Sequence, residues 1–211
     1  MTNIIKILFL LLVLNSQMLF AESSSDKADK LYNQAQRLYS NAKYKEAIPL
    51  YEKSYELKPS KDIPANTGIS YKNIGNYKKS IYWYKVGIKV FNDKKSIFNL
   101  GLLYEEKLLN IDEAIKWYRE AINQKNLDAY DNISLIYHDI RKDNLTASAY
   151  YLATIEKSYT KKQILDFLKN DWKIDEATIK KAYHLQKTLV PNPYYDKEFE
   201  EKIAKKKSGR R

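Results

Sequence analysis

The sequence predicts an all-α fold, an α-solenoid of stacked antiparallel helix pairs, and two observations support this prediction. Asparagines recur along the chain at the constant interval that separates Asn33 from Asn66, which we call the repeat period. Such a period is typical of an array in which one short unit is copied. A small residue follows each asparagine after two places, and a larger apolar or aromatic residue follows after five, as a shared helical face requires. The asparagines are Asn33, Asn66, Asn99 and Asn132, the small residues are Ala35, Gly68, Gly101 and Ser134, and the larger ones are Leu38, Tyr71, Tyr104 and Tyr137.

The segment 1–21 has the order of a secretory signal peptide. Lys6 is the only charged residue before Glu22, an apolar run follows from Ile7 to Leu14, and Ala21 ends the segment with a small side chain. A transmembrane helix needs about 20 predominantly apolar residues, and the uninterrupted run here is much shorter. We therefore expect cleavage after Ala21 and export to the periplasm or the medium. The alternative is an uncleaved segment that anchors the protein in a membrane.

Residues 22–27 are expected to form a short polar linker, and residues 28–157 to form four units of two helices each. In the third unit, Ile97, Leu100 and Tyr104 fall on one face of the first helix, which predicts that they are buried. Each second helix carries a small residue, a tyrosine and another small residue at i, i+4 and i+7, so that backbones can approach closely around an aromatic ring. These triplets are Ala47, Tyr51 and Ser54; Ser80, Tyr84 and Gly87; Ala114, Tyr118 and Ala121; Ala147, Tyr151 and Thr154.

The first unit carries seven residues at marker spacing: Leu31, Ala35, Leu38, Tyr44, Ala47, Tyr51 and Pro59. This spacing resembles a tetratricopeptide repeat, abbreviated TPR. Units three and four have one more residue between their two helices. The third unit, with the strings NLGLLY and DEAIKWYREAI, is similar to a Sel1-like repeat, a related unit with longer turns. The resemblance implies a right-handed α-solenoid in which the first helix of each pair lines a concave surface that receives a partner.

The register of the repeats weakens after residue 157. Apolar residues predict one short helix around 164–168 and a second one around 175–189, which Pro191 stops. We interpret residues 158–190 as a helical cap, because terminal repeats of an array need a more polar outer face. Residues 191–211 are interpreted as a proline break followed by a basic tail.

Composition narrows the partner and argues against catalysis. The formal net charge of +11 favours anionic partners such as acidic proteins, membrane phospholipids and envelope polymers, with nucleic acid the least favoured for an exported chain. The chain has no cysteine and two histidines, so we expect no disulfide, no metal and no cofactor. Ser134, His138 and Asp139 could be assembled into a triad only on paper, because nothing supplies the strained turn that normally presents the serine. We therefore predict a protein that is not an enzyme.

The resemblance places a partner-binding groove on the first helices. An amide side chain both donates and accepts hydrogen bonds, so a column of asparagines suits binding of an extended main chain. The alternative is that these asparagines bond a neighbouring helix or loop of the array. The predicted groove residues are Tyr32, Asn33, Gln36, Tyr39, Asn66, Ile69, Lys72, Phe98, Asn99, Leu102, Glu105, Asn132 and Leu135.

Two functions from different classes follow. The favoured one is an exported, non-enzymatic scaffold that binds a peptide or protein in the groove. The other is a structural or accessory protein of the cell envelope, attached to anionic membrane or polymer through its basic surface. Salt separates them, because attachment by charge weakens steeply as ionic strength rises.

Overall fold

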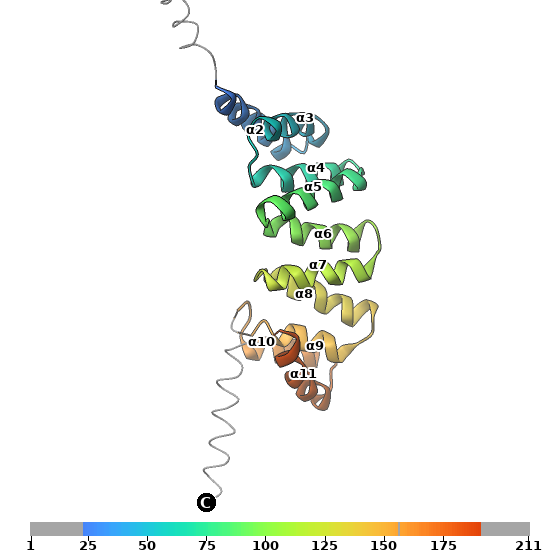
Figure 1. The fold of residues 1–211 in the computed structure, drawn as a ribbon. Helices are drawn as coiled ribbons and strands as arrows, with labels where there is room; N and C mark the ends of the chain where they lie inside the picture. Colours follow the sequence, from blue (N-terminus) through green and yellow to red (C-terminus); the bar gives the residue numbers. More distant parts are fainter. Residues whose placement is uncertain (1–22, 156, 191–211) are drawn as a thin grey trace, which may run out of the picture. The chain divides into compact units, whose positions relative to one another are not determined.

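The computed structural model describes residues 23–155 and 157–190. This part of the chain contains ten α-helices, one π-helix and no β-strand, with a single isolated bridge between Ile155 and Tyr159 (Figure 1). The helices group into two compact units, and the boundary falls between Asp93 and Lys94. The predicted all-α class of stacked helix pairs is confirmed.

The first unit contains two of the predicted helix pairs. Within it, α2 packs on α3, α3 on α4, and α4 on α5, and Figure 1 shows α4 and α5 side by side. Its helices are α2 (Ser24–Ser40), α3 (Tyr44–Leu57), α4 (Asp62–Asn73) and α5 (Tyr77–Phe91). Helix α2 begins inside the segment 22–27 that was predicted to be a linker, because the Ser23 side chain accepts a hydrogen bond from the Asp26 N–H group and caps the helix there.

The second unit contains the other two pairs and the C-terminal helices. Helix α7 packs on both α6 and α8, while α9 packs on α8, on the π-helix η1 and on α11. The elements are α6 (Lys94–Glu106), α7 (Ile111–Asn123), α8 (Asp128–Leu135), η1 (Ile136–Ile140), α9 (Asn144–Leu152), α10 (Lys161–Asn170) and α11 (Glu176–Leu189).

The second-helix tyrosines form the core of the first three pairs, as the small–tyrosine–small spacing predicted. Tyr51, Tyr84 and Tyr118 are fully buried. Two of them lie directly over a glycine of the first helix. A Cβ atom added to Gly101 would come within 2.7 Å of the Tyr118 ring, and one added to Gly68 within 2.5 Å of the Tyr84 ring. Glycine is therefore required at these two positions so that the ring can approach the helix backbone.

Two predicted core positions are wrong. In the fourth pair the buried tyrosine is Tyr150, whereas Tyr151 is half-buried and its ring lies 5.1 Å from that of Phe167. The physical reason is that Tyr151 has aromatic neighbours from outside the four pairs, namely Phe167 of helix α10 and Trp172, whose ring lies 5.5 Å from its own. Tyr104 is also only half-buried, and the side chain of Leu103 is fully buried instead.

The turns within the four pairs show where the additional residue of units three and four lies. Each turn has one residue with a left-handed backbone, five places before the buried small residue of the second helix. The N–H group of the next residue bonds to a first-helix carbonyl five places back in the first two pairs and six places back in the last two. The left-handed residues are Ala42, Gly75, Leu109 and Lys142, and the bonds run from Lys43 to Leu38, Asn76 to Tyr71, Asn110 to Tyr104 and Asp143 to Tyr137, at 2.8–2.9 Å.

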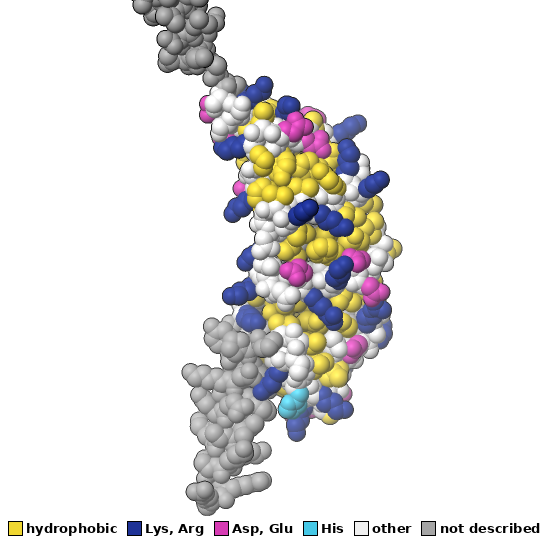
Figure 2. Space-filling view, viewed as in Figure 1, with side chains coloured by type: hydrophobic (Ala, Val, Ile, Leu, Met, Phe, Trp, Pro, Cys, Tyr) yellow, Lys and Arg dark blue, Asp and Glu magenta, His cyan; other side chains and the backbone are white. Residues whose placement is uncertain are grey.

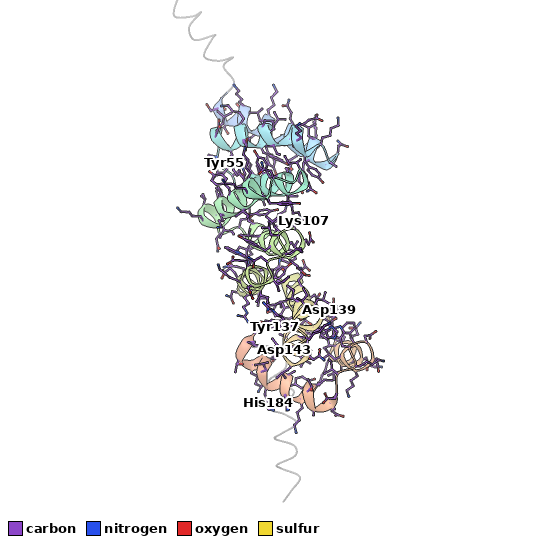
Figure 3. All side chains as sticks on the ribbon, turned by 90° about the vertical axis from the view of Figure 1, so that its right-hand side faces the viewer. Tyr55, Lys107, Tyr137, Asp139, Asp143 and His184 are labelled. Atoms are coloured by element: carbon purple, nitrogen blue, oxygen red, sulfur yellow. The ribbon has the colours of Figure 1, made fainter. Side chains whose placement is uncertain are left out.

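The additional residue therefore lies on the first-helix side of the turn. In the fourth unit the end of the first helix forms the π-helix η1, in which the Arg141 N–H group bonds the Ile136 carbonyl five places back, so that one more residue fits into the turn. Figure 3 labels Tyr137 and Asp143, the two residues that the closing hydrogen bond of this turn joins.

The C-terminal helices form an apolar cluster with α9. Helix α10 begins with a capping box between Thr160 and Gln163, and its buried residues Ile164 and Leu168 pack with Ile179 of α11. Both helices that the apolar pattern predicted after residue 157 are present. None of the helices described is long and apolar enough to cross a membrane. The proposed signal peptide, the residue that follows it and the predicted tail at 191–211 lie outside the described residues.

Candidate functional site

The predicted groove residues lie on the first helices of the pairs, divided between the two units. Those from Tyr32 to Lys72 belong to α2 and α4, and those from Phe98 to Leu135 to α6 and α8. We call the exposed sides of these helices the first-helix surface, and describe it for each unit separately.

In the first unit, the first-helix surface contains a hydrogen-bond network around a buried tyrosine. The Tyr51 hydroxyl donates to Oε1 of Gln36, and Nδ2 of Asn66 donates to the same oxygen at 3.2 Å. Nε2 of Gln36 donates to the Tyr32 hydroxyl at 2.9 Å. The Tyr32 ring lies over Tyr51, with centroids 6.1 Å apart, and burial raises the pKa of the Tyr51 hydroxyl. The network therefore joins α2, α3 and α4.

The second unit repeats this arrangement with different partners. The Tyr118 hydroxyl donates to a carboxylate oxygen of Glu105 and accepts from Nδ2 of Asn132 at 3.1 Å. The Phe98 ring lies 5.8 Å from the Tyr118 ring. Phe98 and Asn132 lie two repeat periods after Tyr32 and Asn66, respectively. In both units, an aromatic residue covers the tyrosine ring and an asparagine of the next pair reaches its polar end.

The four asparagines consequently have different surroundings. Asn66 is 5% exposed, and Asn66 and Asn132 both bond across to a neighbouring helix. Nδ2 of Asn99 donates to the Lys95 carbonyl of its own helix at 2.8 Å, and Asn33 is exposed on α2. Asn66 and Asn132 thus have the bond to a neighbouring helix that was the alternative to ligand binding. Binding of an extended main chain by the column of asparagines stays a prediction.

The other predicted residues differ in exposure. Tyr39 is half-buried, with its ring 5.5 Å from Tyr44 in an edge-to-face contact. Ile69, Lys72 and Leu102 are half-buried, whereas Leu135 is 44% exposed. Leu135 follows Asn132 by three places on α8, so the two share one side of the helix.

The sequence pattern did not identify the tyrosine hydroxyls as part of this surface. Tyr51, Tyr84 and Tyr118 were assigned to the core by their spacing, and their rings are indeed buried. The repeated choice of tyrosine rather than phenylalanine was the available evidence, because a buried hydroxyl needs a hydrogen-bond partner. The hydroxyls of Tyr51 and Tyr118 find these partners among the first-helix side chains.

Glu105 provides a pH test of this arrangement. Burial raises the pKa of its carboxyl, against the opposing effect of the hydrogen bond from Tyr118. The folded state therefore holds the proton more tightly than the unfolded state, and this contribution to stability is lost as pH rises from about 4 through the raised pKa. Glu105→Gln keeps an oxygen that accepts from Tyr118 but cannot ionise. We expect the melting temperature of this variant to rise relative to that of the wild type as the pH increases from about 4 to about 7.

Thermal unfolding followed by circular dichroism measures this difference. Asp166→Asn removes an exposed carboxylate from α10 of the same unit and controls for the change in net charge. A difference between Glu105→Gln and wild type that stays constant or shrinks as pH rises would show that burial does not govern this carboxyl.

Ser134, His138 and Asp139, the residues considered for a catalytic triad, have other contacts. Ser134 is buried and its hydroxyl donates to the Tyr130 carbonyl at 2.6 Å. The His138 ring stacks on Trp172 at 4.2 Å, and its Nδ1 lies 2.6 Å from the Asp139 carboxylate. The serine hydroxyl is thus bonded within its own helix, and a triad geometry is not formed. Within 23–155 and 157–190, no cluster of three or more histidine and carboxylate residues is placed to hold a metal ion.

Comparison with known proteins gives the fold. No protein-family model matches the sequence, and no curated protein matches it. Among solved structures, PilF of Pseudomonas aeruginosa, a TPR protein, is 16% identical with a TM-score of 0.55, covering 78% of this chain and 77% of PilF.

The second structure is c5321, a protective antigen present in uropathogenic Escherichia coli strains that displays a Sel1-like repeat fold. It is 21% identical with a TM-score of 0.56; the match covers 84% of this chain but only 41% of c5321. Together these likenesses confirm the predicted resemblance at the level of fold: the chain folds as a solenoid of the TPR and Sel1-like repeat class.

Proposed function

We propose that this protein is an exported, non-enzymatic scaffold that binds a partner peptide or protein on its first-helix surface. Folds of the TPR and Sel1-like class generally serve as scaffolds for protein–protein interaction. The finer parts of the proposal are the export, the surface used and the chemistry of the partner segment.

The observation that carries the proposed surface is the arrangement around Tyr118 in the second unit. Its ring is fully buried, so its hydroxyl is held in place between Glu105 and Asn132. Leu135, 44% exposed, lies on the same side of α8 as Asn132. Fixed polar groups next to exposed apolar side chains suit an extended peptide, because little side-chain freedom is lost on binding. We therefore propose a partner segment with apolar side chains and accessible main-chain groups.

Export is supported by the order of residues in the segment 1–21, and the absence of cysteine is compatible with it. A helical array of this length can be stabilised by its apolar core, so it needs no disulfides in an oxidising compartment. N-terminal sequencing of the secreted or periplasmic protein, with Glu22 as the expected first residue, tests this part separately from binding.

Two substitutions on the surface test the proposal. The chain from Glu22 onward is cross-linked to its partner in envelope extract, and the affinity of the identified partner segment is then measured. Leu135→Asp and Leu102→Asp are each expected to weaken that binding about tenfold or more, the loss typical of a central interface residue. The matched control is Leu127→Asp. Leu127 is 39% exposed at the other end of α8, so this change adds the same charge outside the proposed surface.

If all three variants bind the partner segment with the affinity of the wild type, and their melting temperatures are unchanged, the first-helix surface is rejected as the binding site. The alternative of charge-driven attachment predicts a different result, namely binding that persists in these variants but is lost in moderate salt or on deletion of the chain from Lys202 onward. On the face drawn in Figure 2, lysine and arginine side chains are scattered over both units with acidic side chains among them. The basic side chains of this face therefore do not gather into one patch.

A further inference from the structure

Arg119 on α7 binds two phenols in place of a carboxylate. Its Nε donates to the Tyr150 hydroxyl at 3.0 Å, and its Nη2 donates to the Tyr137 hydroxyl at 2.9 Å. Among the residues that the structure describes, no carboxylate lies within ion-pair distance of this guanidinium. A guanidinium has five N–H groups and pairs most strongly with carboxylate, so Arg119 retains capacity for an anionic ligand.

Arg119 also lines a hollow of about 270 Å³ in the second unit. Polar groups of Arg119, Asn123 and Tyr150 lie beside apolar side chains in its wall. Such a lining suits a segment that carries an aromatic or aliphatic side chain close to a carboxylate. The remaining wall is formed by Ile122 and by the end of α11 at Leu189 and Val190.

The chain itself continues from the wall of this hollow with a segment of matching chemistry. Pro191 and Pro193 disfavour further helix, and residues 194–201 follow with the sequence YYDKEFEE. This stretch has three aromatic side chains and four carboxylates against one lysine, unlike the basic residues from 202 onward. Six residues span at most about 20 Å, so Asp196 can return to the hollow from Val190. A short tether also gives an effective concentration in the millimolar range.

We propose that residues 191–201, called here the tail segment, dock into the Arg119 hollow of the same molecule, with a carboxylate on the guanidinium and an aromatic ring against Ile122 and Leu189. The docked segment ties the end of α11 to α7 and α9. It also places the acidic part of the tail on the folded unit, apart from the lysines and arginines that follow it.

Limited proteolysis of the full chain tests the docking. Chymotrypsin cleaves after Tyr194, Tyr195 and Phe199, and mass spectrometry of the released C-terminal fragments reports the rate at these sites alone. Arg119→Gln is expected to accelerate this cleavage about tenfold, the effect of losing one charge-assisted hydrogen bond. Arg141→Gln is the matched control, since Arg141 is an exposed arginine of the same unit that pairs with Asp112. In this variant the tail segment should be cut at the wild-type rate.

A second variant leaves the folded part intact, in case Arg119→Gln loosens the two tyrosines. Asp196→Asn with Glu198→Gln, Glu200→Gln and Glu201→Gln neutralises the tail segment, and it should accelerate cleavage as much as Arg119→Gln does. The combined variant should be cut no faster than either, because both changes remove the same interaction. A synthetic peptide of residues 187–203, with and without the four changes, gives the rate of the unprotected sites.

Three outcomes would overturn the proposal. Wild-type cleavage as fast as that of the peptide would show that the tail segment is not docked. Additive effects of the two variants would show that Arg119 and the carboxylates act separately. Protection that increases with protein concentration would assign the hollow to the tail of a second copy.

Discussion

Replacing Tyr118 with alanine is expected to lower the free energy of unfolding of the second unit by about 3–5 kcal/mol, the cost typical of deleting a buried aromatic side chain. The ring is fully buried against Gly101, so its removal leaves a cavity beside a helix backbone that has no side chain to fill it. The change also removes the hydroxyl that joins Glu105 to Asn132. Urea unfolding followed by circular dichroism of the full chain measures the loss.

Two further variants separate the contributions. Tyr118→Phe keeps the ring and removes the hydroxyl, and should cost about 0.5–1.5 kcal/mol. Tyr104→Ala removes the same number of atoms from a half-buried position and should cost clearly less than Tyr118→Ala. If Tyr104→Ala is as damaging as Tyr118→Ala, the second-helix tyrosine is not the centre of the packing.

Much of the fold could be predicted because the repeat imposes the same physical requirement at the same spacing. A ring such as Tyr84 or Tyr118 needs a small partner on the first helix, and Gly68 and Gly101 supply it one period apart. The eight repeat helices α2 to α9 follow from this pairing. The additional residue of the last two turns was also visible in the spacing, although its conversion into the π-helix of the fourth unit was not.

The surroundings of the asparagine column could not be predicted. The register of the repeat fixes on which side of a helix a residue lies, but leaves open which neighbouring side chain reaches it. The Tyr51 hydroxyl donates to Gln36, whereas the hydroxyl of Tyr118, two periods later, donates to Glu105. The difference arises because Leu102 follows Gln36 by two periods and cannot bond a hydroxyl, so Glu105 takes over as acceptor. Such exchanges depend on side-chain length and reach, which a periodic pattern does not encode.

The fourth unit shows the same limit in the core. The periodic pattern placed Tyr151 at the buried position, one period after Tyr118. Ser134 stands where the third unit has Gly101, and the apolar residues Phe167 and Trp172 of the C-terminal region contact the Tyr151 ring. A prediction from repeats alone cannot include neighbours that come from outside the repeats.

Gly101→Ala is expected to lower the free energy of unfolding by about 1–2 kcal/mol, because overpacking outweighs the better helix propensity of alanine. Its Cβ would lie 2.7 Å and 2.8 Å from two ring carbons of Tyr118, so the ring must shift. Overpacking of this kind costs about 1–3 kcal/mol, whereas the gain in helix propensity is at most about 1 kcal/mol. Urea unfolding of the full chain gives the net value.

The effect of Gly101→Ala on the free energy of unfolding should change sign when the Tyr118 ring is absent. In the Tyr118→Ala background the clash no longer exists, so Gly101→Ala should stabilise by about 0.5–1 kcal/mol through helix propensity alone. Gly75→Ala is the control: Gly75 has φ of +79° and no atom within 4 Å of an added Cβ, so its cost of about 1 kcal/mol is conformational and should be the same in both backgrounds. If Gly101→Ala costs as much without the Tyr118 ring as with it, the glycine is not there to admit the ring, and the close approach of the two helices must depend on other contacts.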